Sequence, residues 1–183
     1  MDPILIIREF YQPGSDLYNV LVEHSRQVAQ KSLEIAKGLP AHLSPDLDFI
    51  EKAAMLHDIG IFKTHAPAIG CKGTLPYICH GYLGRELLDS LGLHESYGFV
   101  AERHTGAGIT LENIMDAGLP LPHREMVPVS LEEKIICCAD KFFSKSPKNR
   151  NKIMTREKII RELENINQGH ARRFAAWADD FSL

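Results

Sequence analysis

The chain has 183 residues, of which 44% are hydrophobic and 25% charged, and this apolar content excludes an intrinsically disordered protein. No apolar run approaches the roughly 18 residues that a membrane span needs, and the first residues lack the basic start of a signal peptide. Basic residues number 21 and acidic residues 24, so the formal net charge of −3 predicts no stable nucleic-acid complex.

Glycine and proline divide the chain into amphipathic blocks rather than alternating strands, which predicts an all-α fold. The helices expected, in chain order, are 4–11, 15–38, 44–60, 78–91, 95–104, a short one after Thr110, 130–145 and 155–181. The segments 61–77 and 118–129 are rich in glycine or proline and are predicted loops. Ser130 and Glu133 have the spacing of a capping box at the start of a helix.

One domain is expected over 1–183. Its core is predicted at about 17–145, and the C-terminal amphipathic helix at about 155–181 is predicted to pack on that core. His170 lies in the apolar stripe of this last helix, where a core position is favoured. The pattern leaves the oligomeric state open.

The four cysteines favour a reducing compartment. Cys71, Cys79, Cys137 and Cys138 form no Cys-x-x-Cys pair, so neither a zinc ribbon nor a disulfide framework is expected. We therefore predict a cytoplasmic protein.

Histidine is unusually frequent, with nine residues in the chain, and four of the nine share a pattern with two aspartates. These six residues lie where the predicted helices present apolar faces: His24, His57, Asp58, His80, His104 and Asp140. A lone histidine on such a face is usually an ordinary hydrogen-bonded core residue. Six buried polar groups on five faces are costly unless something neutralises them, and a metal ion does so directly. Imidazole and carboxylate ligands suit iron, manganese, nickel, cobalt or zinc better than magnesium or calcium.

The tandem His57-Asp58 is the centre of this pattern. Neighbouring residues on a helix project about 100° apart, so both side chains reach one ion only near a helix end. Gly60 is predicted to supply that end.

The ordered set resembles the HD-domain metal-dependent phosphohydrolases. The likeness is carried by His24, Leu56-His57-Asp58-Ile59-Gly60 and Ala139-Asp140, and it covers roughly residues 20–145. It implies an all-α HD bundle holding two divalent transition-metal ions. By this resemblance His24, His57 and Asp140 bind one ion, His80 and His104 bind the other, and Asp58 bridges them.

Further motifs narrow the resemblance. Arg103-His104-Thr105-Gly106 is similar to the HD-type diadenosine tetraphosphate hydrolases and to small archaeal and bacterial HD proteins. The fuller run from His104 to Ile109, with its Gly-Ala-Gly centre, is nearer to the second set. The chain departs from the commoner His-Asp-Ile-Gly-Lys motif, because Ile61 stands where the lysine falls and Lys63 comes two residues later.

The resemblance implies hydrolysis of a phosphate ester or anhydride in a small, nucleotide-like substrate. Two cations about 3.5–4 Å apart can share an attacking hydroxide and stabilise the developing charge. The catalytic set predicted here is Asp58 with three nearby cations, Lys63, Arg103 and Lys141. Lys145 is also close in sequence, and the basic segment 141–161 either steers an anion or forms a solvated face.

Two other functions stay open at this point. Some relatives with the same four histidines and two aspartates are di-iron oxygenases, and the ligands alone do not separate the two chemistries. The third hypothesis is a metal-bound module that senses a ligand or binds a partner and has no catalytic activity.

Overall fold

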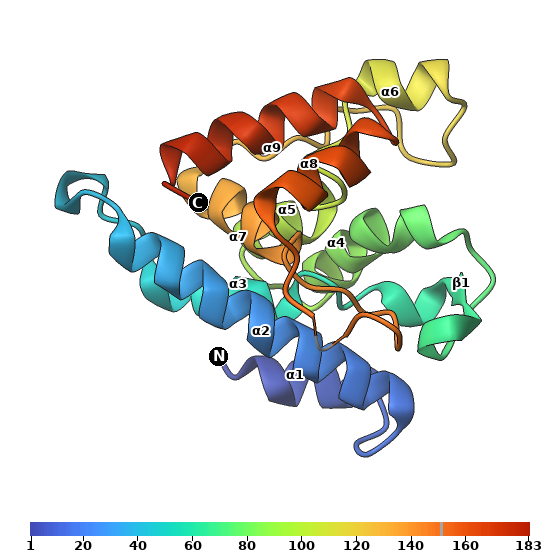
Figure 1. Cartoon of the computed structure of the whole chain (residues 1–183). Coiled ribbons are helices and arrows are strands. Elements are labelled where there is room, and N and C mark those ends of the chain that lie inside the picture. The colour runs from blue at the N-terminus through green and yellow to red at the C-terminus, as the bar shows by residue number, and fades with distance from the viewer. Residues whose placement is uncertain (151) are drawn as a thin grey trace.

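The all-α fold predicted from the sequence is confirmed in the computed structural model, which describes residues 1–150 and 152–183. Its helices are α1 (Pro3–Phe10), α2 (Asp16–Gly38), α3 (Leu47–Leu56), α4 (His80–Ser90), α5 (Glu95–Arg103), α6 (Leu111–Asp116), α7 (Leu131–Asp140), α8 (Arg156–Glu164) and α9 (Gln168–Asp180). Two short antiparallel strands, β1 (His65–Ala66) and β2 (Cys71–Lys72), lie in the predicted loop after α3. In the view of Figure 1, α1 lies at the bottom and α6, α8 and α9 lie at the top.

The long helix α2 carries the central core face. The Ser15 hydroxyl caps it by accepting a hydrogen bond from the Tyr18 N–H at 3.2 Å. Leu21 and Val28 are completely buried, and α2 packs against both α3 and α7. His24 lies on the same inward face, so its imidazole is held inside the bundle by the helical repeat.

Three boundaries of the first seven helices differ from the sequence prediction by three residues or more. The third helix begins at Leu47 rather than at 44, because the Asp46 carboxylate caps it by accepting the Phe49 N–H at 2.9 Å. Its regular part ends at Leu56, four residues before Gly60. The helix expected over 130–145 ends at Asp140, although its predicted Ser130–Glu133 capping box is confirmed.

The prediction of one helix over 155–181 is wrong, because the segment forms α8 and α9. Asn167 starts α9 by accepting the Gly169 N–H at 2.7 Å, a local bond that competes with a continuous helix. Ile166 matched the apolar repeat in the sequence, but its side chain lies in the break and is 70% exposed.

The two C-terminal helices pack on α7. Ile159 and Leu163 of α8 and Phe174 of α9 share a buried cluster with Cys137 and Cys138 of α7. His170 is also buried, as expected for a core position. In the described part of the chain, no helix is long and apolar enough to span a bilayer.

Candidate metal centre

Five of the six predicted ligands lie at helix ends, where side chains leave the regular helical spacing. His57 and Asp58 follow α3, His80 begins α4, His104 follows α5 and Asp140 ends α7. Each of these side chains is buried. Because the helix has ended at Leu56, the adjacent His57 and Asp58 can both point toward the same centre.

Gly60 has a packing role in this arrangement. A Cβ atom there would lie 2.3 Å from the His80 carbonyl oxygen and 2.5 Å from the Gly84 nitrogen. Only glycine therefore lets the turn after Asp58 pack directly on the first turns of α4, which brings Asp58 beside His80.

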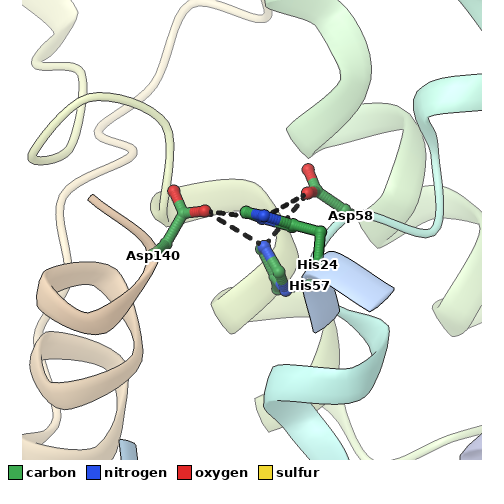
Figure 2. A group of neighbouring side chains, drawn as sticks. All are labelled: His24, His57, Asp58 and Asp140. Atoms are coloured by element: carbon green, nitrogen blue, oxygen red, sulfur yellow. Dashed lines mark hydrogen bonds and ion pairs between the residues drawn. The ribbon is translucent and has the colours of Figure 1, made fainter. Parts of the chain in front are cut away.

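The first group of ligands joins His24, His57, Asp58 and Asp140 (Figure 2). The His24 Nε2 atom lies 2.9 Å from Asp140 Oδ1 and 3.3 Å from Asp58 Oδ2. The His57 Nε2 atom lies 3.1 Å from Asp58 Oδ2 and 3.4 Å from Asp140 Oδ1. One nitrogen from each histidine and one oxygen from each aspartate thus surround a single point.

The second group joins His80 and His104 to the other oxygen of Asp58. Both Nε2 atoms lie 3.4 Å from Asp58 Oδ1, and they are 3.0 Å from each other. Asp58 therefore presents Oδ2 to one pair of histidines and Oδ1 to the other pair. A carboxylate whose two oxygens face different histidine pairs is suited to bridge two cations.

Backbone carbonyls fix three of the imidazole rings. The Nδ1 atoms of His57, His80 and His104 lie 2.6, 2.7 and 2.7 Å from the carbonyl oxygens three residues earlier in the chain. Each Nδ1 therefore donates its proton to the backbone, and in the neutral ring each Nε2 has a free lone pair. Such outer bonds orient metal-binding histidines and select their tautomer.

The donor set fits a transition-metal ion. Among the described residues, His57 Nε2 and Asp58 Oδ1 are buried without a hydrogen-bond partner, which is costly unless a cation satisfies them. Mixed imidazole and carboxylate donors suit first-row transition metals. The two groups are therefore buried sites that could each hold one divalent ion.

The protonation states of the two groups differ. Burial alone would lower the pKa of His57. The charges and hydrogen bonds of Asp58 and Asp140 have the larger combined effect and raise this pKa to about 9. Burial and the neighbouring His104 lower the pKa of His80 to about 3. At neutral pH His57 is therefore protonated before metal binding, whereas His80 is already neutral.

We expect metal binding to the first group to release the His57 proton. The affinity should rise with pH up to about 9, by about tenfold per pH unit for one released proton. Competition with a chelator between pH 6.5 and 8.5 measures this dependence. An affinity that stays constant over this range would contradict the assignment of His57 as a ligand.

Two lysines from the segment after α7 approach the carboxylates. Lys141 Nζ lies 2.5 Å from Asp140 Oδ2, and Lys145 Nζ lies 2.6 Å from Asp58 Oδ2. Burial disfavours their charged forms, but Asp140 and Asp58 respectively raise both lysine pKa values, so both remain cationic. Lys141 was in the predicted catalytic set, whereas Lys145 was named only as close in sequence. The predicted helix ran to 145, but α7 ends at Asp140, and the irregular chain after it brings Lys145 to Asp58.

The other two predicted cations have different surroundings. Arg103 donates to both carboxylate oxygens of Glu133, at 3.2 and 2.9 Å, and its guanidinium lies over the Phe99 ring. Lys63 Nζ lies over the Phe62 ring, 6.0 Å from its centroid. In the described residues, neither has an ion pair with the two aspartates of the centre.

Three of the other six basic residues in the segment 141–161 form ion pairs away from the centre. Arg156 contacts Asp179, Lys158 contacts Glu162 and Arg150 contacts Glu23. Among the described residues of this segment, Lys141 and Lys145 are those with ion pairs to the aspartates of the centre.

A cavity of about 390 Å³ lies beside the centre. Its polar walls include Asp140, Lys141, Lys145 and the hydroxyl residues Ser144 and Ser146. Its apolar walls are supplied by Ala66, Ala68, Ile69, Phe143 and Met154, together with the ring of Tyr77. The Tyr77 ring also stacks on His80, with the ring centroids 4.7 Å apart. This cavity places two cationic side chains at the edge of the metal-ligand cluster.

The model of the HD domain family matches residues 21–144, which include all six predicted ligands. The chain belongs to the HD domain family. An uncharacterised protein of Methanocaldococcus jannaschii is 36% identical over 137 residues, which cover 72% of this chain and 73% of that protein. The predicted resemblance to a small archaeal HD protein is thus confirmed, and the one to diadenosine tetraphosphate hydrolases stays a prediction.

Other similar proteins are longer or more distant. A tRNA (cytidine(56)-2'-O)-methyltransferase of Picrophilus torridus is 30% identical over 81% of this chain, which spans only 37% of that protein. Among solved structures, the HD domain of the phosphodiesterase PgpH of L. monocytogenes superimposes with a TM-score of 0.54 and 15% identity. That match covers 93% of this chain and 88% of the other, and it supports the HD fold.

Helix α9 lies beyond the matched HD region, yet it holds the turn that follows His104. The Arg173 Nε and Nη2 atoms donate to the carbonyl oxygens of Ala107 and Gly108, at 2.7 and 2.5 Å. The Ala107 N–H in turn donates to His170 Nδ1 at 2.9 Å. The C-terminal helix therefore fixes the backbone directly after His104, a predicted ligand of the second group.

Replacing Arg173 with leucine should weaken metal binding at the second group by about tenfold, as expected for loss of an outer support. The first group should be unaffected, because α9 supports the His104 turn and not His24 or His57. Metal titration that resolves two affinities measures the effect, and Arg172→Leu on the exposed neighbouring residue is the control. Equal losses at both groups would count against this specific support.

Proposed function

We propose that this HD domain is a metal-dependent phosphohydrolase with two divalent transition-metal ions, which cleaves a phosphate ester or anhydride in a small, nucleotide-like substrate. The proposal rests mainly on the position of the Asp58 carboxylate. Its Oδ2 atom faces His24 and His57, and its Oδ1 atom faces His80 and His104. When bound, a pair of ions supplies a water of lowered pKa and a clamp for phosphoryl oxygens.

The chain's own residues would position the substrate. Lys141 and Lys145 line the cavity beside the ligand cluster, where their ammonium groups would bind the non-bridging phosphate oxygens. Ser144 and Ser146 offer hydroxyl donors to the same phosphate. The aliphatic and aromatic walls exclude water from part of this cavity, which strengthens these charge interactions.

One similar solved structure supports a nucleotide substrate. The PgpH HD domain, which has the same fold, has been solved in complex with cyclic-di-AMP, and it matches this chain with a TM-score of 0.52. A cavity of about 390 Å³ whose lining combines two cations with apolar side chains is consistent with a phosphorylated compound of modest size.

A substrate panel tests this proposal. Nucleoside monophosphates, dinucleoside polyphosphates, cyclic dinucleotides and bis(4-nitrophenyl) phosphate should be incubated with protein loaded with manganese, iron, nickel, cobalt or zinc. We expect turnover of at least one phosphorylated compound, and its loss in Asp58→Asn. No turnover in the panel, with oxygen consumed by the iron-loaded protein, would replace the proposal with the di-iron oxygenase.

A further inference from the structure

A second cavity, of about 330 Å³, lies between α6 and the junction of α8 with α9. Figure 1 shows the N-terminal end of α9 next to α6 in the upper part of the view. The cavity shares no lining residue with the one beside the metal ligands. Thr105 and Gly106, on the turn after His104, form part of its wall.

His170 presents a hydrogen-bond donor to this cavity. The side chain is 5% exposed, and its Nδ1 atom accepts the Ala107 N–H at 2.9 Å. Burial, together with the charges of Arg173 and Lys141, lowers the His170 pKa to about 4, so the ring is neutral. Because Nδ1 accepts, Nε2 must hold the proton, and this N–H has no partner among the described residues.

The other polar groups in the wall are also available to a ligand. The amide oxygens of Asn113 and Asn167 already cap helices by accepting the N–H groups of Thr110 and Gly169. Their amide nitrogens are therefore the atoms left to contact a ligand, so the lining is rich in donors.

The remaining wall residues are mostly aliphatic and do not suit a charged ligand. Ile78, Ile109, Leu119 and Ile166 make the cavity largely aliphatic. Asp116 is the sole charged residue among its described lining residues, so an anionic phosphate has no counter-charge here. The wall favours a neutral body with an apolar face and acceptor atoms at its edge.

We propose that this cavity binds a neutral, planar heteroaromatic ring of the nucleobase class. The ring faces would pack on the aliphatic walls, and ring nitrogen or carbonyl acceptors would receive the His170 Nε2–H and the two asparagine amides. Thr105 and Gly106 of the wall directly follow His104 in the chain, so a bound ring is expected to affect the second metal-ligand group.

Calorimetric titration of the purified full chain with adenosine tests the proposal, and it does not depend on hydrolase activity because adenosine contains no phosphate. We expect saturable binding that ribose 5-phosphate does not displace. Ile166→Trp and Ala117→Phe, both on exposed wall residues, should weaken it by about tenfold by narrowing the cavity. Ile153→Trp is the matched control, since Ile153 is 72% exposed and Ile166 is 70% exposed.

Absence of adenosine binding at millimolar concentration would overturn the proposal, and so would equal affinity in the two cavity variants and the control. Kinetics then separates two sources of the base. A base belonging to the substrate predicts that Ile166→Trp raises the KM for a nucleotide but not for bis(4-nitrophenyl) phosphate. A separate nucleoside effector predicts that adenosine changes the rate with bis(4-nitrophenyl) phosphate in the wild type but not in Ile166→Trp.

Discussion

Replacing Asp58 with alanine is expected to remove both metal ions from the protein at once. Its Oδ2 atom belongs to the group of His24 and His57, and its Oδ1 atom belongs to the group of His80 and His104. Loss of the carboxylate therefore takes one anionic ligand from each ion. Because the side chain is completely buried, Asp58→Asn is the companion variant, which preserves volume while removing the charge.

Variants within one group provide the control for Asp58. His24→Ala should lower the metal content to about one ion per chain, and so should His104→Ala, because each histidine contacts only one oxygen of Asp58. Elemental analysis of each purified variant measures this pattern, with circular dichroism to confirm folding. An Asp58 variant that is folded and still holds two ions would show that the carboxylate does not bridge.

Replacing Lys145 with methionine should change metal binding and catalysis in opposite directions. Its ammonium lies 2.6 Å from Asp58 Oδ2, so it competes with a metal ion for that oxygen. Removing it should tighten metal binding at the first group by about tenfold, the scale of one charged hydrogen bond. The same change should lower kcat/KM by about 10²–10³-fold, because the phosphate loses a cation that stabilises its transition state.

Lys148→Met is the matched control for Lys145, since it removes an exposed lysine from the same basic segment. Metal affinity is measured by chelator competition, and kcat/KM with the substrate identified by the panel. A Lys145 variant that loses both metal and activity would indicate that the lysine supports the fold of the centre rather than the substrate.

The features of the site that could be predicted from the sequence depend on the geometry of single helices. The helical repeat placed His24 on an inward face, and the need for a helix end explained how adjacent His57 and Asp58 could converge. The structure has both features, with His24 buried in α2 and α3 ending at Leu56. These rules act within one helix, which is why a single sequence was sufficient for them.

The features that were not predicted depend on contacts between distant segments. Nothing local indicates that Arg103 pairs with Glu133, or that Lys145 reaches Asp58 across an irregular stretch. The break at Asn167 was hidden because Ile166 preserved the apolar spacing while its side chain points outward. The support of the His104 turn by α9 likewise joins residues more than 60 positions apart.

The number and position of the metal ions in the native protein test the bridging role of Asp58 most directly. The full chain should be purified without oxygen, analysed for transition metals and crystallised for anomalous diffraction. We expect close to two ions per chain, on either side of Asp58, one near His24 and His57 and the other near His80 and His104. Protein without bound transition metal, or with ions that do not contact Asp58, would contradict it.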